Sequence, residues 1–338
     1  MRVVVVGATG NVGTSVVEAL AADPGVDEVV GVARRLPEWD PSPKTSFVAV
    51  DVRDADLVPV FDGAAAVVHL AWFFQPTRDP AVTWEANVIG STRVFTAAAA
   101  AGAEALVHAS SVGAYSCRPA DDHEVDETWP THATNSTAAY GREKAYLERV
   151  LDGFERANSA MRVVRMRPAF TFKRAAGSSQ RRIFAGSIFP DPLVRPGRLP
   201  VLPLPRGLRI QAVHSADVAD AYVRAVTSDA SGAFNLAADD VLDAAGLAEA
   251  LGSRPVELPS GFVRAAAATA WHAHLLAAAP ELFDMALGVP LMATRRAREE
   301  LGWSPRHTAA EAVAEAAEGI ADGSGMDTEP LAPRAESA

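Results

Sequence analysis

A glycine-rich loop lies directly between the first apolar run of the chain and the segment that follows it. The run at 2–6 reads RVVVV and is typical of a buried strand, and a helix is expected from about 11 to 22. Between them, Gly7, Gly10 and Gly13 are spaced as G-x-x-G-x-x-G. Glycines there permit a tight turn and a close approach of the backbone to a pyrophosphate, whose charge the helix N-terminus stabilises. The loop predicts a dinucleotide-binding βαβ unit; an ordinary turn before a helix is the alternative.

Strand and helix signals then alternate over the first half of the chain. One long helix is expected to have Asp79 as its N-cap, Pro80 in its first turn and Gly102 near its end. Apolar strands that alternate with helices form a parallel sheet covered on both faces. The expected fold is therefore α/β, a Rossmann-type doubly wound parallel sheet with a smaller, mainly helical C-terminal substrate lobe. The further strands are expected at 27–33, 46–51, 64–71, 104–111 and 161–167, and another helix at 136–157.

The character of the sequence changes after Pro168. The stretch 190–207 is rich in proline and predicts an irregular or extended segment, whereas 210–226 returns to a strand followed by a helix. Helix signals dominate from about 240, with a capping box from Thr308 to Glu311. We therefore expect a dinucleotide-binding domain over 1–168 to which 208–237 returns, a substrate-binding lobe of 169–207 and 238–321, and a disordered tail over 322–338.

The charge balance narrows the range of partners. The net charge is −11 and the isoelectric point is near 5.2, which argues against a nucleic-acid or anionic-membrane partner. A single cysteine, Cys117, cannot form an intrachain disulfide, and no long apolar signal segment is present. The eight histidines show no helical H-x-x-x-H pair. We expect a cytoplasmic protein without a metal site.

Two arginines follow the second expected strand, about twenty residues beyond the glycine loop. A carboxylate at this place would bind both ribose hydroxyls of NAD. Arg34 and Arg35 suit a 2′-phosphate instead, through charge-assisted contacts. The sequence therefore favours NADP(H), with NAD(H) as the other cofactor to consider; two solvated surface charges are the alternative interpretation.

The segment AAYGREKAY, at 138–146, holds a tyrosine and a lysine four residues apart. Tyr140 and Lys144 therefore share one helix face. Composition alone would give only about 0.04 such pairs in a chain with so few tyrosines and lysines. A neighbouring ammonium, and the positive nicotinamide ring of an oxidised cofactor, would lower the pKa of the phenol and let it exchange a substrate proton near neutrality. The alternative is a surface helix, and we assign Arg142 and Glu143 to its solvated side.

A serine pair, Ser110 and Ser111, closes the fifth expected strand. Doubly wound folds place ligands at the carboxyl ends of their strands. Ser111 would polarise a substrate carbonyl while Tyr140 moves the proton and a nicotinamide moves hydride. Either serine could instead be a turn or cap residue.

Several motifs, in order, resemble the extended short-chain dehydrogenases/reductases, also called the NAD-dependent epimerase/dehydratase family. The resemblance runs through about residues 1–320 and includes later segments similar to family landmarks, VHSADVADA and LGWSPRHT. It rests on the loop Gly7-Ala8-Thr9-Gly10-Asn11-Val12-Gly13, on Asp51 and Val52, on His69-Leu70-Ala71, on Asn87-Val88-Ile89-Gly90-Ser91-Thr92, on Ser111, and on the Tyr-x-x-x-Lys motif from Tyr140 to Lys144.

The resemblance implies an NAD(P)-dependent enzyme that acts on a small molecule, in which Ser111, Tyr140 and Lys144 are catalytic. Family members often form homodimers, so the resemblance leaves a homodimer possible. The implied cofactor-binding residues are Gly7, Thr9, Gly10, Asn11, Val12, Gly13, Arg34, Arg35, Asp51, Val52, Leu70, Ala71, Asn87, Ser110, Tyr140, Lys144 and Pro168. The implied substrate-pocket residues are Trp72, Phe73, Val112 and Phe170.

Departures from the family pattern bear on the substrate. Sugar-nucleotide dehydratases carry an acidic pair after the site serine or threonine, where this chain has Val112 and Gly113. Many sugar-nucleotide epimerases hold the substrate phosphates with an asparagine after the sixth strand, where this chain has Phe170. They also use an arginine before the later histidine, and Arg209 lies one residue away from that position. These differences favour a dehydrogenase or reductase acting at a carbonyl or alcohol carbon. An epimerase with retained NAD and a non-catalytic dinucleotide sensor are the alternatives.

Overall fold

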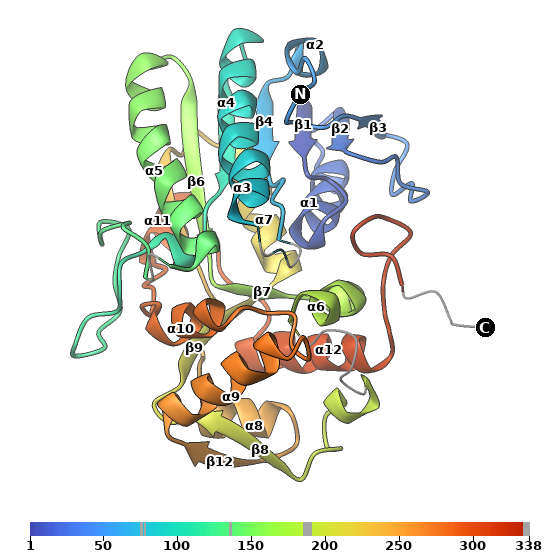
Figure 1. Cartoon of the computed structure of the whole chain (residues 1–338). Coiled ribbons are helices and arrows are strands. Elements are labelled where there is room, and N and C mark those ends of the chain that lie inside the picture. The colour runs from blue at the N-terminus through green and yellow to red at the C-terminus, as the bar shows by residue number, and fades with distance from the viewer. Residues whose placement is uncertain (75–76, 78, 135–136, 185–190, 334–338) are drawn as a thin grey trace.

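A seven-stranded parallel sheet forms the centre of the molecule in this computed structural model, which describes residues 1–333 apart from 75–76, 78, 135–136 and 185–190 (Figure 1). The strand order is β10-β6-β5-β4-β1-β2-β3, and every neighbouring pair in it is parallel. The strands are β1 (Arg2–Val6), β2 (Glu28–Ala33), β3 (Thr45–Ala49), β4 (Ala66–His69), β5 (Ala105–Ala109), β6 (Arg162–Pro168) and β10 (Gly232–Leu236).

The strand order reverses between β1 and β4. From β1 the chain first adds β2 and β3 on one side, and then β4, β5, β6 and β10 on the other. The loops that leave the carboxyl ends of β1 and β4 therefore diverge, and this is where such sheets bind ligands. The predicted doubly wound α/β fold is confirmed.

The unbroken apolar runs of the strands are explained by helices on both faces. Successive strand residues point to opposite faces, so Val3 and Val5 pack in one core with α1 (Asn11–Ala22) and α7 (Ser215–Thr227). Val4 and Val6 pack in a second core with α4 (Gly90–Ala100) and α5 (Ala139–Ala157). The sheet is thereby covered on both sides over most of its width, with the edge strand β3 more exposed, and the loops at its carboxyl edge border a cleft.

The long helix predicted after Asp79 is interrupted. Its N-cap is as predicted, because the Asp79 carboxylate accepts a 2.9 Å hydrogen bond from the Ala81 N–H. The helix α3 (Pro80–Thr83) then continues into a π-helical turn, Trp84–Ile89, before α4 begins. Such π-turns often occur at functional sites, and this one contains Asn87.

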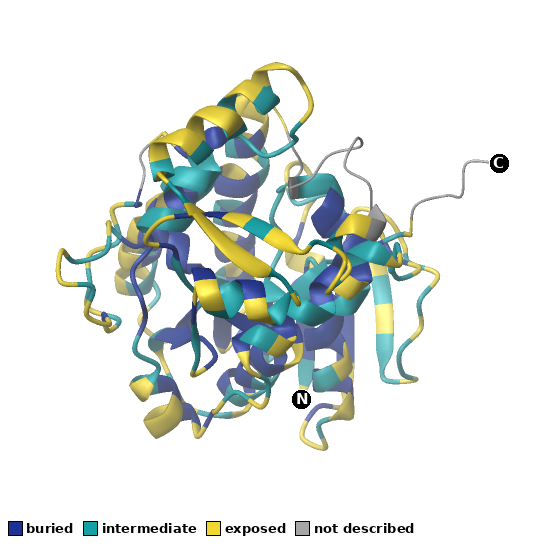
Figure 2. Ribbon diagram, turned by 90° about the horizontal axis from the view of Figure 1, so that it is seen from below, coloured by how far each residue is buried: buried dark blue, intermediate teal, exposed yellow. Residues whose placement is uncertain are grey.

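The smaller lobe combines helices with two small sheets. One sheet has the order β11-β9-β7 and the other pairs β12 with β8, so part of the proline-rich stretch predicted to be irregular or extended forms a strand. The underside of the lobe is largely exposed (Figure 2): most of β12 is exposed, and α9 contains no buried residue. Its elements are β7 (Phe170–Phe172), α6 (Gly177–Phe184), β8 (Val201–Pro205), β9 (Arg209–His214), β11 (Val241–Asp243), α8 (Ala244–Ala250), β12 (Arg254–Leu258), α9 (Ser260–His272), α10 (Pro280–Gly288), α11 (Arg295–Leu301) and α12 (Ala309–Ala321).

The predicted start of the last helix is confirmed. The capping box at the start of α12 is present in both directions between Thr308 and Glu311.

Four shorter elements complete the described chain. They are α2 (Val58–Phe61) and the 3₁₀ turns Val112–Ala114, Arg174–Ala176 and Asp191–Val194. Within the described part of the chain, no helix combines the length and the apolarity needed to cross a membrane.

The prediction of a disordered tail from residue 322 is wrong for residues 322–333. Leu331 is fully buried and Thr328 is only 2% exposed. The segment has no apolar periodicity from which its order could be predicted. Hydrogen bonds to distant residues hold it, among them a 3.1 Å bond from Thr328 Oγ1 to the carbonyl oxygen of Thr9. The remaining residues of the predicted tail, 334–338, lie outside the described residues.

Candidate active site

Close contacts require glycine at two of the three glycine positions of the first loop, Gly7 and Gly13. Gly7 has φ +89°, and a Cβ there would lie 2.4 Å from the backbone nitrogen of Ala71. A Cβ at Gly13 would lie 2.1 Å from the carbonyl oxygen of Gly7, whereas a Cβ at Gly10 would meet that oxygen at an ordinary 3.6 Å. Gly10 is the N-cap of α1 and no side chain caps this helix. The loop is therefore a close-packed cradle at an open helix N-terminus, which fits a dinucleotide pyrophosphate.

A cleft of about 450 Å³ opens over this loop. Its volume lies within the range of small-molecule and cofactor sites. Arg53, Arg182 and Glu329 are among the lining side chains that were not predicted. The predicted residues that line it are Gly7, Thr9, Gly10, Arg34, Arg35, Asp51, Val52, Leu70, Ala71, Trp72 and Phe73.

Other predicted cofactor residues are directed elsewhere. Asn11 Nδ2 donates to the carbonyl oxygen of Thr171 at 3.0 Å, and Ser110 Oγ donates to the buried carboxylate of Glu148 at 2.5 Å. Asp51 lines the cleft, but its carboxylate is held by the Arg53 guanidinium at 2.8–3.2 Å. The lining of the cleft does not include Asn11, Val12, Gly13, Asn87, Ser110, Tyr140, Lys144 or Pro168.

Ser111 and Tyr140 meet beside the carboxyl end of β5. The two hydroxyls are hydrogen-bonded, and Ser111 Oγ also accepts a 3.1 Å bond from the Gly113 N–H. A Cβ on Gly113 would come within 3.0 Å of the Tyr140 ring, and one on Gly141 within 2.8 Å of the Gly113 carbonyl oxygen. The small residues therefore allow the first turn of α5 to approach Ser111.

Lys144 lies one turn further along α5 and is 4% exposed. Its Nζ donates a 2.5 Å hydrogen bond to the Ala109 carbonyl oxygen and lies 3.6 Å from the centroid of the Trp72 ring. Burial lowers the pKa of this ammonium to about 7, against the opposing charges of Glu148 and Glu143. Lys144 therefore changes charge near neutral pH.

The pKa of Tyr140 moves in the direction opposite to the prediction. Burial raises it above the ordinary phenol value, and the hydrogen bond with Ser111 only partly offsets this. The Lys144 ammonium lies 5.9 Å from the centroid of the Tyr140 ring and is held by Ala109 and Trp72 instead. Tyr140 is thus a protonated group, suited to donating a proton.

A second cavity, of about 290 Å³, shares the aromatic residues Trp72, Phe73 and Phe74 with the first cleft. Tyr140 also lines it and makes edge-to-face contacts to Trp72 and Phe74, at 5.7 and 5.0 Å between ring centroids. Of the predicted substrate-pocket residues, Trp72 and Phe73 line this cavity. Val112 is buried in the core, and Phe170 packs against that core from β7, so neither lines the cavity.

Glu143 is the functional candidate that the sequence interpretation missed. It was assigned to the solvated side of α5, yet it is fully buried and lines the second cavity. Its carboxylate accepts hydrogen bonds from Thr83 Oγ1 at 2.6 Å and Asn87 Nδ2 at 2.8 Å. Burial raises the pKa of Glu143 despite these bonds. The helical period could have indicated this burial. Glu143 lies three residues after Tyr140 and four before Leu147, so the three side chains share one face of the helix.

A buried ion pair fixes α5 against the sheet below the site. Arg167 on β6 binds the Glu148 carboxylate at both oxygens, at 2.8 and 2.9 Å, and Ser110 donates to the same group. Burial alone would raise the pKa of Glu148, but Arg167 outweighs it and holds the pKa below the ordinary value. The pair positions the helix that carries Tyr140 and Lys144.

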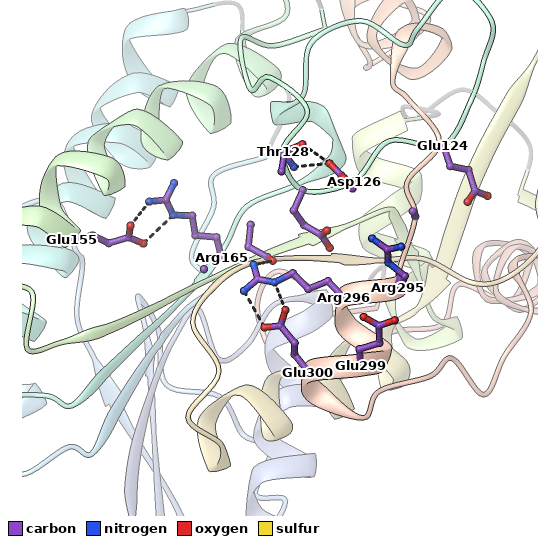
Figure 3. A pocket seen from close by; sticks show the side chains of 13 residues that line it. Glu124, Asp126, Thr128, Glu155, Arg165, Arg295, Arg296, Glu299 and Glu300 are labelled. Carbon is purple, nitrogen blue, oxygen red and sulfur yellow. Dashed lines mark hydrogen bonds and ion pairs between the residues drawn. The ribbon is translucent and has the colours of Figure 1, made fainter.

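A cavity of about 750 Å³ lies at the β6–β10 edge of the sheet and includes none of the predicted site residues. Two of the arginines that line it are ion-paired, as Figure 3 shows for Arg165 with Glu155 and Arg296 with Glu300. These ion pairs occupy the two guanidinium groups. Over the described ranges of the chain, no three histidine, cysteine or acidic side chains cluster in a way that could hold a metal ion.

Comparison with known proteins identifies the family. The model of the NAD dependent epimerase/dehydratase family matches residues 3–237. The chain is 30% identical over 331 residues to a 3-diazoavenalumate denitrifying reductase from a Streptomyces species, covering 91% of this chain and 97% of that protein. It is 29% identical over 317 residues to an uncharacterized protein of Mycobacterium bovis, of which it spans only 29% of the length.

Solved structures share the fold at low sequence identity. A UDP-glucose-4-epimerase from Stenotrophomonas maltophila superposes with a TM-score of 0.71 at 21% identity, covering 95% of this chain and 98% of that one. The UDP-glucose 4-epimerase from Thermotoga maritima gives a TM-score of 0.70 at 20% identity, covering 95% and 99%. The family match, the Streptomyces relative and the fold agree: the chain belongs to the NAD dependent epimerase/dehydratase family of extended short-chain dehydrogenases/reductases.

Proposed function

We propose that this protein is an NAD(P)H-dependent reductase of a compact, apolar carbonyl compound, with Tyr140 as the proton donor. The observation that carries the proposal is the position of Tyr140, which is hydrogen-bonded to Ser111 and lines an aromatic cavity next to the glycine-loop cleft. Trp72 and Phe73 line both cavities, so a cofactor in one and a substrate in the other would meet at these shared residues.

The residues of the first cleft fit a nicotinamide dinucleotide. The cradle formed by Gly7 and Gly13 would receive the pyrophosphate at the N-terminus of α1. Arg34 and Arg35 line the end of the cleft that follows β2, where a 2′-phosphate would lie, so we favour NADP(H) over NAD(H). When bound, such a cofactor supplies the hydride for carbonyl reduction.

The chain's own residues supply proton transfer and orientation. Ser111 would hold the substrate oxygen beside the Tyr140 hydroxyl. The raised pKa of Tyr140 keeps this phenol protonated, which suits a general acid for reduction better than a base for oxidation. Lys144, with a pKa of about 7, would be divided between its charged and neutral forms at neutral pH and would make proton transfer sensitive to pH there.

The lining of the second cavity supports a small uncharged substrate. Among the residues that the structure describes, its only ionisable side chains besides Tyr140 are the carboxylates of Glu143 and Glu281. A substrate diphosphate would find repulsion there, and about 290 Å³ is at the lower limit of small-molecule sites. Arg209, close to the place of the family's phosphate-binding arginine, pairs with Asp122 at 2.8 Å. The Streptomyces relative is named as a reductase, in agreement with this proposal.

An epimerase is the second candidate, because part of the sequence favours it. Over 150 residues, 41% of this chain, the protein is 34% identical to the UDP-glucose 4-epimerase of Mycolicibacterium smegmatis. An epimerase keeps its dinucleotide through the catalytic cycle, whereas a reductase must release it. The two candidates therefore differ in what the purified protein carries.

The test compares cofactor retention and turnover in one preparation. The nucleotide released on denaturation is identified, and NADPH and NADH oxidation is followed with a panel of aromatic and alicyclic aldehydes and ketones. UDP-glucose and UDP-galactose are assayed in parallel for interconversion. We expect little retained nucleotide and oxidation of reduced cofactor with carbonyl compounds. Stoichiometric NAD together with UDP-sugar interconversion would contradict the proposal and support the epimerase. Dinucleotide binding without turnover of any substrate would support a sensor.

A further inference from the structure

The C-terminal segment, residues 323–333, lies against the loop that forms the floor of the cofactor cleft. It follows α12, and Figure 1 shows it as the red loop that extends toward the blue N-terminal elements. Thr328 Oγ1 donates to the carbonyl oxygen of Thr9 at 3.1 Å, and the N–H of Glu38 donates to the carbonyl oxygen of Asp327 at 3.2 Å. The segment therefore contacts both the glycine loop and the stretch that follows β2.

Helix α6 anchors both ends of this segment. Ser178 Oγ donates to the carbonyl oxygen of Gly323 at 2.8 Å, and its N–H donates to that of Ser324 at 2.9 Å. The Arg182 guanidinium donates to the carbonyl oxygens of Pro330 and Ala332. With these bonds and the full burial of Leu331, the segment has a defined position as one wall of the cleft.

An acidic residue of this wall meets one of the arginines assigned to the cofactor. Glu329 and Pro330 line the cleft together with Arg34 and Arg35. The Glu329 carboxylate lies 3.8 Å from the Arg35 guanidinium, and the two side chains are 54% and 74% exposed. At such exposure the ion pair adds little to folding stability. The Glu329 carboxylate instead affects the binding of any anion that contacts the Arg35 guanidinium.

We propose that Glu329 sets the balance between NADP(H) and NAD(H) by competing with the 2′-phosphate for Arg35. The inference rests on the proposed function, which places the adenosine ribose beside Arg34 and Arg35. A phosphate monoester carries between one and two negative charges at neutral pH, so Glu329 both occupies its cation and repels it. The ribose 2′-hydroxyl of NAD(H) is uncharged and is not subject to this competition.

The test measures binding rather than turnover. Wild type, Glu329→Gln and Glu257→Gln are titrated with NADPH and with NADH, with nucleotide fluorescence as the readout, at low and at high salt. Glu257 is the matched control, because it is exposed on β12 and lines neither cleft, yet its substitution changes the net charge equally. We expect Glu329→Gln to bind NADPH roughly two- to fivefold more tightly with NADH unchanged, and the gain to shrink at high salt.

A second pair of variants tests whether Arg35 mediates the effect. In an Arg35→Ala background, Glu329→Gln should lose most of its NADPH gain, because the contested guanidinium is gone. No change in the NADPH-to-NADH affinity ratio with Glu329→Gln would overturn the inference while leaving the cofactor cleft in place. A full gain without Arg35 would overturn the competition. If wild type binds neither dinucleotide, the proposed function fails and the inference fails with it.

Discussion

The buried carboxylate of Glu143 accepts a 2.8 Å hydrogen bond from the side-chain amide of Asn87, which is 56 residues away in the sequence. The amide oxygen of Asn87 in turn accepts a 2.6 Å bond from the Phe73 N–H, and its nitrogen also donates to the Phe73 carbonyl oxygen. Helix α5, the π-helical turn and the aromatic residues that line the second cavity are thus joined through one side chain. Asn87 was predicted to contact the cofactor, and in the structure its side chain supports the residues around it.

Removal of the Glu143 carboxylate should destabilise the fold. Glu143→Ala leaves the Thr83 hydroxyl and the Asn87 amide without their acceptor in a buried place, which should lower the free energy of unfolding by about 1–3 kcal/mol. Glu143→Gln keeps an acceptor and should lose less. Urea unfolding of both variants, with Glu257→Ala at an exposed position on β12 as a control, measures this. An effect of Glu143→Ala no larger than that of the control would contradict the network's role.

Lys144 should make stability depend on pH in a defined direction. Its pKa is about 7 in the folded protein and ~10.4 in an unfolded chain. Between these values the unfolded state binds the additional proton, so stability rises with pH. We expect the unfolding free energy of wild type minus that of Lys144→Met to increase from pH 7 to 9 by up to about 1.4 kcal/mol per pH unit. A difference that stays constant from pH 6 to 9 would mean that Lys144 is not desolvated.

The glycine loop permits a matched comparison of two alanine substitutions. Gly13→Ala would place a Cβ 2.1 Å from a backbone oxygen, whereas Gly10→Ala makes only an ordinary contact at 3.6 Å. Because the first clash involves two backbone segments, it can be relieved only by moving α1 or the loop. We expect Gly13→Ala to lose about 2 kcal/mol or more of stability and Gly10→Ala about 1 kcal/mol or less. Thermal unfolding of the two variants measures this difference in stability. Equal losses of stability would contradict the close packing of Gly13 against Gly7.

The fold could be predicted from the sequence because its signals are local. The apolar runs, the glycine spacing after Arg2–Val6 and the N-cap at Asp79 each depend on a few neighbouring residues, and each is found in the structure. The serine and tyrosine of the site were predicted from separate motifs, and the structure brings them into hydrogen-bonding contact.

The rest depends on contacts between residues far apart in the chain. Glu143 looks like a surface residue beside Arg142, until Thr83 and Asn87 provide buried donors for it. The pKa of Tyr140 follows from how deeply α5 packs against Gly113 and not from the spacing to Lys144. The docked C-terminal segment has no apolar period, so nothing local distinguishes it from a disordered tail.

The central claim is that Tyr140 donates the proton, and Tyr140→Phe tests it most directly. The substitution removes one hydroxyl and keeps the ring that packs against Trp72 and Phe74. Tyr146→Phe, on the same helix and 39% exposed, is the matched control. We predict that Tyr140→Phe binds the dinucleotide as wild type does but loses about 100-fold or more in carbonyl turnover, while Tyr146→Phe retains activity. Unchanged turnover in Tyr140→Phe would contradict the account.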